Sequence, residues 1–187
     1  MQEKEHVISV LERAKKAIKQ KNIPEIKSLS DKTIHSAQIY QDADNIALAV
    51  ILYALSKAIE RERYREYEDW DLFEKVYEIS ITRAINDLKK GDIEHYRIHI
   101  SEIRKAIKNL SKEFRKHMED VFRKAQINKA SRLYEHGMSL ETTARILGIT
   151  LWELNQYVGQ TGISNVNLAY TKDLNERIKL AEDIFKK

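Results

Sequence analysis

The feature that most constrains the fold is a regular spacing of apolar residues over residues 93–121. These positions alternate at intervals of three and four, and the last continues the seven-residue step: Ile93, Tyr96, Ile100, Ile103, Ile107, Leu110, Phe114 and Val121. This heptad pattern predicts one long helix with an apolar seam. Such a seam closes a bundle within one chain or pairs two subunits, and we expect a homodimer through this helix.

The scarcity of turn residues indicates the same class. The 187 residues include five Gly and one Pro, too few for the many tight connections of a sheet protein. An apolar run from Ile46 to Leu55 is typical of a buried central helix. We expect an all-α protein with a helical bundle over residues 1–120. Its long heptad-patterned helix leads into a C-terminal helix-turn-helix module with a terminal helix over residues 121–187.

Several residues predict where helices begin and end. Pro24 suits the first turn of a helix, where its missing N–H group costs nothing. Gly91 can adopt the left-handed conformation that ends a helix, and Asp92 can cap the next one.

The composition excludes some kinds of protein. Because the chain has no Cys, it can form no disulfide, thiolate metal site or Cys nucleophile. Residues 1–20 are charged and lack the apolar core of a signal peptide. The run from Ile46 to Leu55 is about half as long as a membrane-spanning helix requires. We therefore expect a cytoplasmic protein without membrane contact, cofactor or enzymatic activity.

The positive charge is concentrated in the second half of the chain. The formal net charge is +4, and between Ser101 and Leu133 ten Lys and Arg residues accompany only four Asp and Glu residues. Such asymmetry suits an acidic partner, with nucleic acid as the first candidate. The alternative is an ordinary solvated helix face.

Residues 139–159, directly after this basic stretch, fit a helix-turn-helix. Ser139 can cap the first helix, Ala144 is small enough to lie under a crossing helix, and Gly148 tolerates the left-handed turn. Leu147 and Ile149 are apolar residues that flank the turn. Thr150 can cap the second helix, and Leu154 and Tyr157 can point inward. An ordinary helical corner is the alternative.

The segment GITLWELNQYVGQTGISNVNLAYTKDLNERIK, residues 148–179, resembles the C-terminal part of small prokaryotic antitoxin-like helix-turn-helix proteins. The matching positions are Gly148, Ile149, Trp152, Glu153, Leu154, Gly162, Ile163, Tyr170, Asp173 and Leu174. The chain departs from the family at Leu151, where an Arg is usual, and in the mixed charge of its terminal helix. The resemblance implies a DNA-binding fold and a regulatory or antitoxin role.

In a helix-turn-helix, the second helix enters the major groove of double-stranded DNA. The polar residues expected to contact bases are Thr150, Asn155 and Gln156. The cations expected to contact phosphates are Arg123, Lys124, Lys129, Arg132 and Arg145. For Trp152, we favour packing against the terminal helix over base contact.

Two further hypotheses remain open. His95, His99 and Glu102 could share one helix face as metal ligands, although a solvated His pair is more common, and we expect no metal. The helix-turn-helix fold could also serve a protein-interaction or scaffold protein that does not bind DNA, with a protein partner on the N-terminal bundle.

Overall fold

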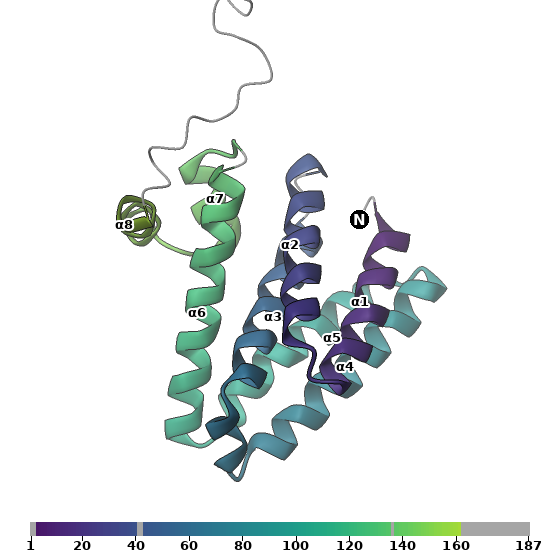
Figure 1. Ribbon diagram of the computed structural model, residues 1–187. Helices are drawn as coiled ribbons and strands as arrows, with labels where there is room; N and C mark the ends of the chain where they lie inside the picture. The colour runs from purple at the N-terminus through teal and green to yellow at the C-terminus, as the bar shows by residue number, and fades with distance from the viewer. Residues whose placement is uncertain (1–2, 41–42, 136, 162–187) are drawn as a thin grey trace, which may run out of the picture.

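The computed structural model describes residues 3–40, 43–135 and 137–161, and within them the regular structure is entirely helical (Figure 1). The helices are α1 (Lys4–Lys19), α2 (Ile23–Tyr40), α3 (Ala43–Glu60), α4 (Trp70–Lys90), α5 (Ile93–Ala106), α6 (Lys112–Glu135), α7 (Leu140–Leu147) and α8 (Leu151–Thr161). Two 3-10 turns, η1 (Glu62–Glu66) and η2 (Ile107–Asn109), connect some of them. The expected all-α class is confirmed.

Helices that follow one another pack side by side. α2 lies against α3, and α4 lies against α5, while α1 bridges the two pairs through α2 and α4. α3 also packs along α6, which stands at one edge of the bundle with α7 and α8 beyond it (Figure 1). The bundle and the C-terminal helices therefore meet through α6.

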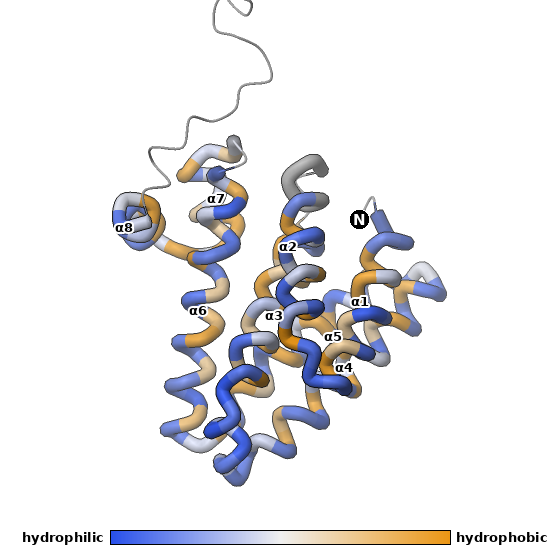
Figure 2. Tube along the Cα trace, viewed as in Figure 1, coloured by the Kyte–Doolittle hydropathy of each residue, from blue (hydrophilic) through white to orange (hydrophobic). Residues whose placement is uncertain are grey.

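α3 is the central helix, as its apolar run predicted. From Ile46 to Ile59 almost every side chain is buried: Tyr53 and Lys57 are half-buried, and Ala47 alone in this stretch is exposed. The other helices turn an apolar stripe inward and a mostly hydrophilic face outward (Figure 2). The buried apolar residues form one continuous cluster, which extends from α1 to α8.

The predicted helix ends have the local causes expected of them. Pro24 lies in the first turn of α2, where the Asn22 side chain accepts a hydrogen bond from the Glu25 N–H at 3.2 Å. Gly91 ends α4 with φ +82°, and Asp92 caps α5 by accepting from the His95 N–H at 3.0 Å. These three predictions are confirmed.

The prediction of one long heptad helix is wrong, because the chain bends between α5 and α6. Leu110 is extended (φ −75°, ψ 156°), and the Ser111 N–H donates to the Asp69 carboxylate at 2.5 Å. Ser111 directly precedes α6, at a position where Ser commonly starts a helix. A side chain from the turn before α4 therefore stabilises a bend that the apolar spacing does not reveal.

The seam residues are nevertheless buried within the chain. Those from Tyr96 to Val121 are at most 6% exposed. Because this surface is used inside one molecule, the expected homodimer through the heptad helix is not supported. The predicted boundary after residue 120 falls inside α6, which belongs to both parts.

Candidate nucleic-acid interface

α7 and α8 form a three-helix unit with α6. The buried residues of the α7–α8 corner are Thr143, Ala144, Leu147, Ile149, Leu154 and Val158. The apolar residues predicted to flank the turn or to point inward are therefore buried, apart from Tyr157, which is half-buried.

The turn between α7 and α8 depends on Gly148. Its φ is +64°, in the left-handed region that favours glycine. The Ile149 N–H then donates to the Ala144 carbonyl at 3.0 Å and closes the end of α7. Ala144 is buried and Gly148 is left-handed, as predicted for these two positions, while the helix-turn-helix assignment stays a prediction.

Side-chain caps hold the start of both helices. The Ser139 hydroxyl accepts from the Thr142 N–H at 3.1 Å, as predicted. At α8, the Thr150 hydroxyl accepts from the Glu153 N–H at 3.2 Å, and the Glu153 carboxylate accepts from the Thr150 N–H at 3.0 Å. This reciprocal capping box has the sequence signature Thr-x-x-Glu, which the sequence analysis missed.

Arg123 of α6 contacts both this cap and the turn that precedes α8. Its guanidinium forms a two-pronged ion pair with Glu153, with one contact at 2.9 Å, and donates to the Gly148 carbonyl at 3.2 Å. The Arg123 pair, followed by the bonds from Thr150, lowers the pKa of Glu153 to about 2. Arg123, expected to contact phosphate, instead positions α8.

The expectation that Lys129 contacts phosphate is corrected by its burial. The side chain is fully buried, and its Nζ lies 2.7 Å from the Asp31 carboxylate and 4.5 Å from the centre of the Tyr53 ring. Burial lowers the pKa of Lys129, and the contact with Asp31 partly opposes this shift. Lys129 joins α2, α3 and α6 rather than facing solvent.

The other three predicted cations are exposed. Lys124 pairs with Asp120 at 2.8 Å, and Arg132 pairs with Glu135 at 2.9 Å. Arg145 of α7 has no ion pair or hydrogen bond with any described residue. Surface pairs of this kind contribute little and exchange readily, so all three side chains are available to an anionic partner.

The outer face of α8 carries no unpaired charge. Asn155 and Gln156 are exposed as predicted, and Thr150 is exposed although its hydroxyl also donates to Glu153 at 2.6 Å. Leu151 and Trp152 are 46% and 70% exposed. The terminal helix proposed to cover Trp152, and the family matches after residue 161, lie outside the described residues.

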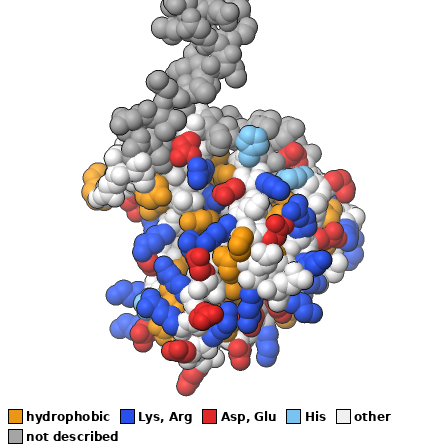
Figure 3. Space-filling model, viewed as in Figure 1, with side chains coloured by type: hydrophobic (Ala, Val, Ile, Leu, Met, Phe, Trp, Pro, Cys, Tyr) orange, Lys and Arg blue, Asp and Glu red, His pale blue; other side chains and the backbone are white. Residues whose placement is uncertain are grey.

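A groove of about 680 Å³ runs beside α8, between it and α3 and α6. Trp152, Gln156 and Gln160 line one wall, and Lys57, Arg61 and Lys124 supply cations on the others, next to Glu60 and Glu153. Figure 3 shows basic and acidic side chains interspersed over the visible face of the molecule. The sequence did not indicate Lys57 and Arg61, because only the fold brings the end of α3 beside α8.

The three residues considered as metal ligands do not converge. His95 pairs with Asp92 at 2.7 Å, whereas His99 lies between Glu102 at 2.9 Å and Asp87 at 3.1 Å. Within residues 3–40, 43–135 and 137–161, no group of three or more such side chains has the arrangement of a metal site.

Comparison with known proteins adds no assignment. No family model matches the chain, and neither a curated protein nor a solved structure matches it. None of the helices in the described part has both the length and the apolar character needed to cross a membrane.

Proposed function

We propose that the protein binds double-stranded DNA through α8 and acts as a transcriptional regulator or an antitoxin-like protein. The observation that carries this proposal is the exposed, uncharged face of α8, which a capping box and Arg123 hold in a defined position. A preorganised helix with polar side chains is suited to reading base edges in the major groove.

Asn155 and Gln156 are the residues proposed to read bases. Their amides can form paired hydrogen bonds to adenine, and the neighbouring Leu151 or Trp152 can contact a thymine methyl group. Thr150 is proposed to contact the DNA at the start of the helix, while it continues to cap α8.

Phosphate attraction is proposed to come from cations around α8. These are the exposed Lys124, Arg132 and Arg145 of the predicted set, joined by the half-buried Lys57 and Arg61 along the groove. The resemblance of residues 148–179 to antitoxin-like proteins supports the same role. A homodimer remains part of the proposal, through a surface other than the heptad seam, and sedimentation velocity tests it.

Fluorescence anisotropy with random-sequence duplex DNA across a salt series tests the proposal. We expect affinity to fall steeply with salt, and Lys124→Gln or Arg145→Gln to reduce the logarithmic salt slope by about 1 each. The matched control Lys75→Gln removes the same charge from an exposed position of α4, away from α8 (Figure 1), and should leave the slope unchanged. Absence of binding even at low salt overturns the proposal.

Selection of bound sequences from a random DNA pool tests base reading. The wild-type protein is expected to enrich a motif, whereas Asn155→Ala combined with Gln156→Ala should relax the motif without changing the salt slope. Enrichment of the same motif by the variant contradicts the assigned role of these two residues.

A protein partner at α8 is a second candidate function. It is favoured by Trp152, which is 70% exposed beside the exposed Leu151 and the groove. Tryptophan commonly dominates protein interfaces. A partner that the wild-type chain captures and Trp152→Ala loses, with no DNA binding by either, supports this alternative over DNA binding.

A further inference from the structure

A second cavity lies on the other side of α6, where the N-terminal bundle meets α7. It measures about 300 Å³, at the lower end of the range of about 300–1,000 Å³ typical of small-molecule sites. Its apolar walls come from four helices: Val50 and Ile51 of α3, Ile100 of α5, Phe122 of α6, and Ile146 and Leu147 of α7. Ala47 and Arg104 are exposed at its edge, so the cavity opens to solvent.

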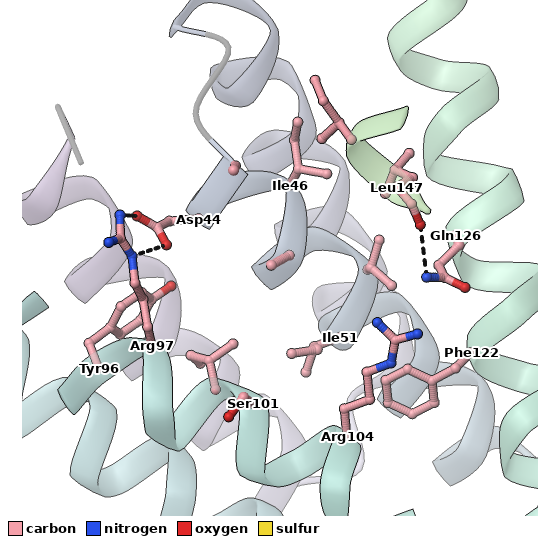
Figure 4. Close-up of a pocket in the computed structure, with 15 residues that line it drawn as sticks. Asp44, Ile46, Ile51, Tyr96, Arg97, Ser101, Arg104, Phe122, Gln126 and Leu147 are labelled. Atoms are coloured by element: carbon pink, nitrogen blue, oxygen red, sulfur yellow. Dashed lines mark hydrogen bonds and ion pairs between the residues drawn. The ribbon is translucent and has the colours of Figure 1, made fainter. Parts of the chain in front are cut away.

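Two arginines of α5 line this cavity, and they differ in their partners. Arg97 forms a two-pronged ion pair with Asp44, at 2.8 Å for each contact. Arg104 has no ion pair or hydrogen bond with any described residue. Figure 4 shows its side chain extending from α5 toward Phe122 and Gln126. The cavity therefore combines an apolar body with one uncompensated guanidinium.

The far end of the cavity is part of the α7–α8 corner. Gln126, which is 7% exposed, donates to the Leu147 carbonyl at 3.0 Å (Figure 4). Leu147 is the last residue of α7 and directly precedes Gly148 of the turn. A molecule in the cavity contacts Ile146 and Leu147, and it thus contacts the segment that places α8.

We propose that this cavity binds a small amphipathic carboxylate and that binding stabilises the end of α7. The carboxylate pairs with Arg104, whose planar fork matches two carboxylate oxygens. The hydrocarbon body fills the space between Ile51, Phe122 and Leu147. The volume limits the ligand to a short chain or a single ring.

Isothermal titration calorimetry with sodium octanoate tests the site, at concentrations where octanoate does not self-associate. We expect saturable binding to one site, weakened about tenfold or more by Arg104→Met. Lys105→Met is the matched control, because it removes the same charge from the next residue of α5, which does not line the cavity. Octan-1-ol, which lacks the carboxylate, should bind more weakly than octanoate and should not respond to Arg104→Met.

Ala47→Trp places a large side chain at the exposed edge of the cavity, and it should abolish binding of both probes. Absence of saturable octanoate binding overturns the proposal. So does equal weakening by Arg104→Met and Lys105→Met, or binding that survives Ala47→Trp, because each places octanoate elsewhere on the surface.

Amide hydrogen exchange tests the effect on α7. Octanoate is expected to slow exchange in peptides that cover residues 144–150 in the wild-type protein and not in Arg104→Met. Binding without such protection refutes the proposed effect on α7. Both measurements report on the cavity directly, so their outcome is independent of whether α8 binds DNA.

Discussion

The Lys129–Asp31 pair should respond unequally to removal of its two members, because only one of them is buried. Lys129 is fully buried, whereas the Asp31 side chain is 57% exposed. Asp31→Ala leaves a buried ammonium group with the Tyr53 ring as its remaining partner. We expect a loss of about 2 kcal/mol, below the about 3–5 kcal/mol of a fully buried pair, because water can enter where Asp31 was.

Lys129→Met should have a much smaller effect on stability, because it removes the buried charge itself. Methionine retains most of the buried volume, and the Asp31 carboxylate left behind is already hydrated. The free energy of unfolding should therefore stay within about 1 kcal/mol of wild type. The double variant should match Lys129→Met, which gives a coupling of about 2 kcal/mol in the double-mutant cycle.

Urea denaturation followed by far-UV circular dichroism measures these differences. A loss for Lys129→Met as large as that for Asp31→Ala refutes the reasoning, because it means that the ion pair is net stabilising.

The pH dependence of the unfolding free energy gives an independent check. Burial lowers the pKa of Lys129, so between this pKa and the higher pKa of an unfolded lysine only the unfolded chain holds the proton. Stability rises with pH in that window, and Lys129→Met should remove the rise.

Three further predictions concern α8 and its turn. Gly148→Ala should destabilise by about 1 kcal/mol through its left-handed φ alone, since an added Cβ meets no atom within 4 Å. Gly159→Ala, inside α8 with similar free space, should stabilise by about 0.5–1 kcal/mol; equal effects of the two substitutions in urea denaturation contradict this. The lowered pKa of Glu153 predicts that its cap stabilises the protein above about pH 4.3, the pKa of an unfolded Glu, and is lost as the pH falls toward about 2. The difference in unfolding free energy between wild type and Glu153→Gln should shrink over that range, and a constant difference argues against the role of the cap. Leu154→Ala empties a fully buried position and should destabilise by about 2–5 kcal/mol in a thermal or urea melt; a loss below 1 kcal/mol would show that α8 is loosely packed.

Helix ends with local causes could be predicted from the sequence. Gly91, Ser139 and Gly148 act through their own backbone or through neighbours three or four residues away. The bend between α5 and α6 could not, because residues 93–135 contain no Gly or Pro and the apolar spacing continues across it. Its stabilising contact comes from Asp69, 42 residues before Ser111.

The same distinction explains the candidate interface. Arg123 and Lys129 resembled their exposed neighbours in the sequence, and only partners 30 and 98 residues away show that they hold the fold. The exposure of Asn155 and Gln156 was predicted correctly, since it follows from the helical repeat of α8. Long-range charge pairing is the information that a single sequence pattern does not contain.

α6 is a support that the bundle and α8 share. Its 24 residues span about 36 Å at about 1.5 Å per residue. α3 packs along this helix, and Lys129 near its C-terminal end pairs with Asp31 of α2. α8 is fastened to the same helix at Arg123, so a substitution that shifts α6 against α3 should displace α8 together with it.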